Sequence, residues 1–176
     1  MHMTPRRAIA SMHIAALMFG LTGIFGKLTV AGPLAIVLGR AFFAVLALLV
    51  FARIFSSPIL RGMNRTRLLQ LAACGLLLGV HWPDFSLGNQ ATAGLLWALL
   101  SGFCFAAASV GNRYTANYLH PVQIACWQNL VILFCLLPFG PMAVAQMVPL
   151  DWLWIALLGL FCTGLAHGLF VASLQV

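Results

Sequence analysis

Acidic residues are almost absent from this sequence. Only Asp84 and Asp151 stand against nine lysines and arginines, and charged residues make up 6% of the 176 residues. A water-soluble domain carries roughly 25% charged residues, so this chain lacks the polar surface that water would require. Its 63% hydrophobic content and mean hydropathy of +1.05 instead indicate an integral membrane protein with the lipid bilayer as its solvent.

Other absences exclude several classes of function. The five cysteines lie in apolar stretches without CxxC or Cys/His spacing, so we expect core cysteines and no metal site. The basic residues cluster at the ends of apolar stretches rather than along one face, which argues against nucleic acid as a partner. No serine elbow is present, and neither acid lies near a histidine within a helix. The sequence therefore predicts neither an enzyme nor a bound cofactor.

Apolar stretches dominate the chain and are separated by glycine, proline and serine. A helix needs about 20 apolar residues to cross the hydrocarbon core. The third stretch is clearly short, because a helix rises about 1.5 Å per residue and its length would be only about 22 Å. We predict an all-α membrane protein of six transmembrane segments, near residues 8–30, 34–52, 68–82, 94–111, 122–139 and 150–174.

The distribution of arginine predicts the orientation of the chain. The longest polar connection, residues 53–67, holds four arginines, and Arg6 and Arg7 precede the first stretch. Cytoplasmic loops are enriched in lysine and arginine, so both signals place the N-terminus in the cytoplasm. Alternation then puts the loop around Asp151 outside. It also places His13 and His81 near opposite sides, so a haem held by a facing pair of histidines is not expected.

The two halves of the chain, residues 1–90 and 91–176, repeat one order of features. Each has a helix, a basic residue with a threonine, a proline, a second helix, and a helix with glycine and histidine. Because three crossings separate the halves, the second would be inverted relative to the first, as is typical of secondary transporters. The matched features are GKLT (26–29) and NRYT (112–115), Pro33 and Pro121, Arg40 and Gln128, and GLLLGVH (75–81) and GLAHG (164–168).

Four segments also carry a family resemblance. They are HIAALMFGLTGIFGKLTVAGPLAIVLGRAFFAVLALLV, GLLLGVHW, GLLWALLSGFCFAAASVGNRYTANYLHPVQIACWQNLVILFCLLPF and WIALLGLFCTGLAHGLFVASLQ. In this order they resemble the EamA-type family of drug/metabolite transporters, over most of the chain. The resemblance implies a transporter of small metabolites or drugs, most simply an exporter, that works by alternating access in a bacterial inner membrane.

The chain departs from that family in length. EamA-type proteins have ten helices in two inverted five-helix repeats, whereas here His81 and Trp82 run directly into PDFSLGNQATAG. About two helices are missing at the Trp82–Pro83 junction relative to that pattern, and two more would follow Val176. The alternative to a transporter is therefore a non-transporting deletion remnant or a helper subunit that needs a partner chain. Assembly as a homo-oligomer is also open.

Polar residues inside the apolar stretches are the candidates for a substrate site. Arg40 lies where an arginine costs about 2.5–3.5 kcal/mol if it is near the helix centre. It would bind an anionic group of a small-molecule substrate, such as a carboxylate, or would snorkel to the outer interface. Gln128 is the repeat equivalent of Arg40 and has Trp127 beside it. The Gln128 amide would bind substrate or join two helices.

Histidines and the remaining bases complete the candidate set. His81, with Trp82 next to it, and His167 lie near glycine-rich helix faces. They would contribute to the substrate site and relay protons, or would stay neutral and hydrogen-bond across helices. Lys27 and Arg113 end the first helix of each half, where they would gate the cavity or anchor the chain at the interface.

Overall fold

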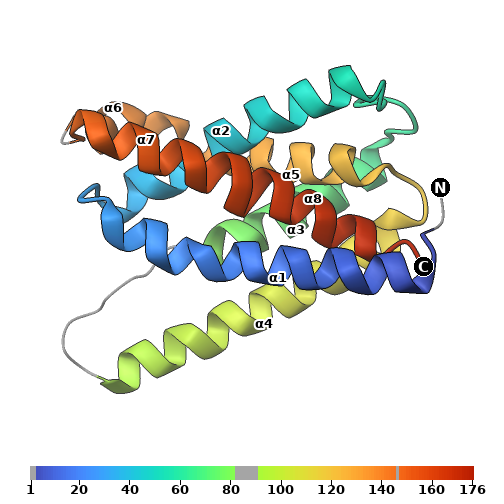
Figure 1. The fold of residues 1–176 in the computed structure, drawn as a ribbon, viewed down its shortest axis with the longest axis horizontal. Coiled ribbons are helices and arrows are strands. Elements are labelled where there is room, and N and C mark those ends of the chain that lie inside the picture. Colours follow the sequence, from blue (N-terminus) through green and yellow to red (C-terminus); the bar gives the residue numbers. More distant parts are fainter. Residues whose placement is uncertain (1–2, 82–90, 146) are drawn as a thin grey trace.

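The protein is all-helical over the residues that its computed structural model describes, which are 3–81, 91–145 and 147–176. Side chains are described for these residues except 79–81 and 91–98. The elements are α1 (Pro5–Leu28), α2 (Pro33–Ile54), α3 (Arg65–His81), α4 (Ala91–Ala116), α5 (Pro121–Leu136), η1 (Leu137–Phe139), α6 (Gly140–Val144), α7 (Pro149–Leu157), the π-helix η2 (Leu158–Leu165) and α8 (Ala166–Ser173). Figure 1 shows the bundle that they form. The predicted all-α class is confirmed.

Prolines fix where several of the helices begin. Pro5, Pro33, Pro121 and Pro149 each lie in the first turn of a helix. The proline ring holds φ at about −65°, and the N–H that it lacks would have no partner in the first turn of a helix. The residue before each of these prolines is extended, which is the conformation that a following proline favours.

The helices differ in how well they match the thickness of a bilayer. Within the described residues, four helical stretches are long and apolar enough to cross a membrane: Pro5–Leu28, Pro33–Ile54, Pro121–Val144 and Pro149–Ser173. Helix α3 has 17 residues, about 26 Å at the usual rise, against a hydrocarbon core of about 30 Å. That α3 and the 26-residue α4 also cross the membrane stays a prediction.

Helix α5 lies at the centre of the packing. It contacts α2, α3, α4 and α8, while α1 lies along α8 and α3 lies along α4. Figure 1 shows α1 and α8 side by side. Buried residues follow one another along α5, so this helix has no broad lipid-facing stripe. The largest core cluster joins Ile124 of α5 to Leu71 of α3 and Val171 of α8.

Two glycines allow neighbouring backbones to approach closely. A methyl group on Gly159 of η2 would lie 2.9 Å from the carbonyl oxygen of Arg40 in α2. A methyl group on Gly75 of α3 would lie 2.9 Å from the carbonyl oxygen of Gln128 in α5. Both distances are too short for a real side chain, so each helix pair depends on glycine.

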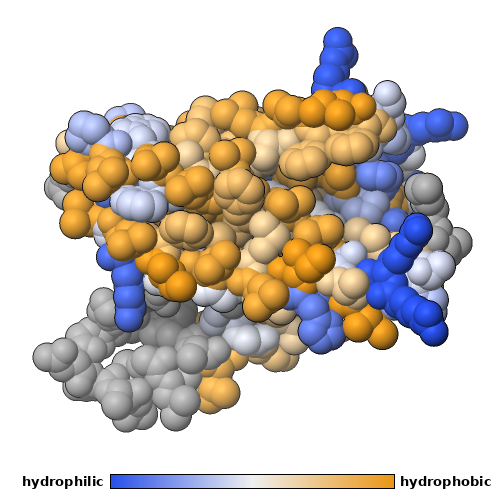
Figure 2. Space-filling view, viewed as in Figure 1, coloured by the Kyte–Doolittle hydropathy of each residue, from blue (hydrophilic) through white to orange (hydrophobic). Residues whose placement is uncertain are grey.

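Most basic side chains gather at one end of the bundle, which we call the arginine-rich end. α1, α3 and α5 begin there, and α2, α4 and α8 end there. Figure 2 shows hydrophilic side chains projecting from that end, beyond a largely hydrophobic surface over the helices. The end carries seven of the nine lysines and arginines: Arg6, Arg7, Arg53, Arg61, Arg65, Arg67 and Arg113.

At the opposite end, Asp151 joins segments that are distant in sequence. Its carboxylate accepts hydrogen bonds from the Thr29 hydroxyl (2.6 Å), the Val30 amide (2.9 Å) and the Val148 amide (3.0 Å). Asp151 is 1% exposed and lies in the first turn of α7, within the helix that the sequence predicted over residues 150–174. It therefore ties the α1–α2 connection to the start of α7.

Asp151→Asn is expected to lower the free energy of unfolding by about 2 kcal/mol, because one carboxylate oxygen becomes an amide that cannot accept a hydrogen bond. Thr29→Val should cost about 1 kcal/mol, and the double variant should cost less than the sum. Thr66→Val, at an exposed threonine, is the control. Unfolding of the purified chain by denaturing detergent measures the effects. Additive losses would show that the two side chains do not act together.

The two ends of the described chain meet at the arginine-rich end. The amide of Met3 donates to the carbonyl oxygen of Gln175 over 2.9 Å. The Arg113 guanidinium donates to the carbonyl oxygens of Leu174 and Val176. These bonds hold the start of α1, the end of α4 and the end of α8 together.

Candidate functional site

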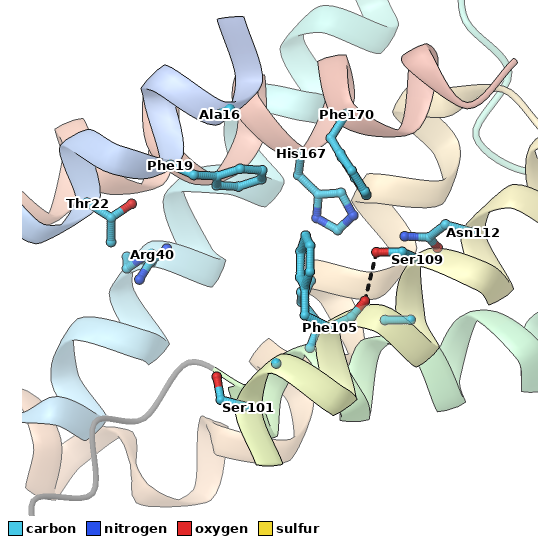
Figure 3. Close-up of a pocket in the computed structure, with 13 residues that line it drawn as sticks. Ala16, Phe19, Thr22, Arg40, Ser101, Phe105, Ser109, Asn112, His167 and Phe170 are labelled. Atoms are coloured by element: carbon cyan, nitrogen blue, oxygen red, sulfur yellow. Dashed lines mark hydrogen bonds between the residues drawn. The ribbon is translucent and has the colours of Figure 1, made fainter. Parts of the chain in front are cut away.

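A cavity of about 580 Å³ lies inside the bundle and is called the central cavity below. Ligand sites are typically about 300–1,000 Å³, so it is large enough for a small organic molecule. Its walls come from α1, α2, α3, α4 and α8 (Figure 3). The lining residues are Ala16, Phe19, Thr22, Arg40, Leu78, Ser101, Gly102, Phe105, Ala108, Ser109, Asn112, His167 and Phe170.

Arg40 is the only one of these thirteen described lining residues with a permanent charge. It is 6% exposed, and its Nε donates to the Thr163 hydroxyl of η2 over 3.1 Å. π-helical turns inside α-helices are frequent at functional sites, and this one places Thr163 against the guanidinium. The structure thus places Arg40 in the cavity wall, where a bound anion would meet its charge.

Aromatic rings and a histidine form the middle of the central cavity. Phe105 of α4 and Phe170 of α8 have ring centroids 5.5 Å apart, and Phe19 of α1 lies 6.4 Å from each. Figure 3 shows the His167 imidazole between Phe105 and Phe170. His167 is 3% exposed, so it lies inside the bundle. This region offers flat apolar surfaces with one polar group among them.

The Asn112 amide lies on the side of the cavity opposite Arg40 (Figure 3). Asn112 lines the cavity, and its side-chain oxygen accepts a hydrogen bond from Nε2 of Gln128 over 2.5 Å. Gln128 is fully buried behind Asn112, and its Oε1 has no hydrogen-bond partner within the described residues. Gln128 therefore joins α5 to α4 and orients the cavity-lining amide of Asn112.

The other predicted site residues lie elsewhere. The Trp127 indole N–H donates to the Ile59 carbonyl oxygen over 3.0 Å, on the loop between α2 and α3 and away from the central cavity. Lys27 is exposed near the end of α1, and Arg113 is exposed near the end of α4, at opposite ends of the bundle. Trp82 and the side chain of His81 lie outside the described residues.

Sequence reasoning missed most of the cavity wall. Phe19, Phe105 and Phe170 line it, but the sequence gives no signal that separates them from lipid-facing phenylalanines. Asn112 was noted only as part of the repeated NRYT segment, although an amide within an apolar helix is itself a signal. Within the described segments, no three His, Cys, Asp or Glu side chains lie close enough to hold a metal ion.

The helices and the hydrophobic surface define a multi-pass membrane protein. Residues 92–176 match the EamA-like transporter family, which confirms the predicted family resemblance over that half of the chain. The match shows that these residues are similar to a family of membrane transporters. No curated protein and no solved structure matches the chain.

Proposed function

We propose that this protein transports small organic molecules with an anionic group, and that the central cavity is the substrate site. The observation that carries the proposal is Arg40, a buried guanidinium in the cavity wall. An arginine within a membrane helix is costly, and such residues commonly mark substrate pathways. A carboxylate or phosphate would contact Arg40, and its apolar part would lie against Phe19, Phe105 and Phe170.

We also propose that residues 1–90 and 91–176 are inverted repeats that work by alternating access. The packing supports this relation. Gly159, in the third helix of the second half, faces the Arg40 carbonyl, and Gly75, in the third helix of the first half, faces the Gln128 carbonyl. Arg40 and Gln128 are the paired positions of the sequence repeat. Each half thus packs a glycine of its third helix against the paired position, Arg40 or Gln128, in the second helix of the other half.

The direction of insertion and transport is part of the same proposal. The arginine-rich end would face the cytoplasm, in agreement with the positive-inside rule, in a bacterial inner membrane. The described acid, Asp151, lies at the other end. As the family resemblance implies, we propose that the chain exports its substrate. His167 would relay protons if transport is coupled to a proton gradient.

A matched pair of ligands tests the anionic preference. Phenylacetate should stabilise the purified chain against thermal unfolding, and neutral phenylacetamide should bind at least about tenfold more weakly, because it lacks the charge that Arg40 contacts. Uptake of labelled phenylacetate into vesicles containing the chain would then test transport. Equal binding of the acid and the amide would contradict the proposed substrate class.

The second candidate function is a subunit that works only beside a partner chain. The observation in its favour is a small-residue face on α1, where a methyl group added to Gly20, Gly23 or Gly26 would have no atom within 4 Å. In membranes, such faces commonly pack against other helices.

Cells expressing the chain should be compared with cells expressing a version with a family-like stretch inserted between Trp82 and Pro83. Efflux only with the insertion would show that the chain does not transport by itself, as this second function requires.

A further inference from the structure

A second pocket lies at the arginine-rich end, between the last turns of α2 and the loop that follows. It has a volume of about 520 Å³ and is called the loop pocket. None of its residues lines the central cavity. The loop pocket is lined by Leu49, Ala52, Arg53, Ser56, Ser57 and Ile59.

The polar side chains of the loop pocket are hydrogen-bond donors. Arg53 carries a guanidinium, and Ser56 and Ser57 carry hydroxyl groups. Among the described residues, no side-chain hydrogen bond engages any of the three. A guanidinium matches the geometry of phosphate oxygens, and hydroxyl groups add further donors. The pocket therefore has the chemistry of a phosphate site.

Buried side chains of α5 hold the loop in place. Nε2 of Gln123, which is 1% exposed, donates to the carbonyl oxygens of Ile59 (2.9 Å) and Arg61 (3.1 Å). The Trp127 indole donates to the same Ile59 oxygen. At the other side of the pocket, the Ser57 amide donates to the Ala52 carbonyl oxygen over 2.8 Å. The loop is thus fixed before any ligand arrives, which lowers the entropy cost of binding.

The surroundings of the loop pocket are those of a membrane interface. The pocket lies where the membrane-spanning helix α2 ends, at Ile54. Ile54, Phe55 and Leu60 are each at least two-thirds exposed. Figure 2 shows hydrophobic surface close to the projecting hydrophilic side chains of this end. A phospholipid has both parts that such a surface fits, a phosphate and acyl chains.

We infer that the loop pocket binds the phosphate of an anionic phospholipid. Arg53 contacts the phosphate oxygens and Ser57 donates a further hydrogen bond. The acyl chains run along Leu49 and the exposed apolar residues at the end of α2. Positive charge from the neighbouring arginines of this end favours a lipid with a net negative headgroup over a zwitterionic one.

Lipid binding to the purified full chain in a neutral detergent tests the inference. In native mass spectrometry, phosphatidylglycerol should bind at least about tenfold more tightly than phosphatidylcholine. Glycerol 3-phosphate, which offers the phosphate without acyl chains, should bind far more weakly. Arg53→Gln should weaken phosphatidylglycerol binding by at least about tenfold, because a charge-assisted hydrogen bond is lost.

Matched variants separate the pocket from diffuse attraction. Arg7→Gln removes one exposed charge at the same end outside the pocket, and it should weaken binding less than about threefold. Trp127→Phe keeps a ring but removes the donor to Ile59, and it should weaken binding without changing the helical circular dichroism. Equal losses in the Arg53 and Arg7 variants, or equal binding of the two lipids, would overturn the inference. So would glycerol 3-phosphate binding as tightly as the lipid.

Discussion

Gly159→Leu is expected to destabilise the protein by about 3 kcal/mol or more, which lowers the ratio of folded to unfolded chain by more than about 100-fold. The new Cβ would lie 2.9 Å from the carbonyl oxygen of Arg40 and 3.3 Å from the amide nitrogen of Ala44. Both are backbone atoms, so no rotamer change relieves the contact. Helix η2 would have to move away from α2.

Gly20→Leu is the matched control. No atom lies within 4 Å of a methyl group placed on Gly20, and leucine favours a helix more than glycine does. This variant should therefore be neutral or more stable by up to about 1 kcal/mol. Detergent unfolding and size-exclusion chromatography of both variants measure the difference. Similar effects at the two sites would contradict the close packing of α2 on η2.

Arg40→Gln is expected to reduce phenylacetate binding by about 30-fold or more, because the charge that contacts the carboxylate is lost. Glutamine can still donate a hydrogen bond to Thr163, so the variant should remain folded. The expected result is weaker binding by a folded protein.

Further variants distinguish a substrate-binding role for Arg40 from a structural one. Arg40→Lys keeps the charge and should retain part of the binding, although lysine lacks the planar fork of the guanidinium. Arg7→Gln, a charge loss at an exposed site, should change neither binding nor stability by more than about 0.5 kcal/mol. Loss of stability in Arg40→Gln with unchanged binding would show that Arg40 is a structural residue.

The sequence predicted the helices well because proline and apolar length set their positions. The structure begins helices at Pro33 and Pro121, close to the predicted starts. It extends α4 to Ala116, beyond the predicted end at residue 111. The polar segment after Gly111 is therefore helical too. The π-helix η2 was not predictable, because its residues, LGLFCTGL, carry no pattern that distinguishes a π-helix from an α-helix.

The candidate site was predictable only where polarity conflicts with the surroundings. Arg40 and His167 are polar groups within apolar helices, and the structure places both in the cavity wall. Trp127 and Gln128 are adjacent in sequence but serve different regions, because α5 is buried on more than one face. An apolar helix without a lipid-facing stripe gives no pattern from which to assign the direction of each side chain.

The contact between Met3 and Gln175 bears on how the bundle could open. It joins the start of α1 to the end of α8 at the arginine-rich end, beside the Arg113 contacts. Any motion that separates these two helices at that end has to break these bonds.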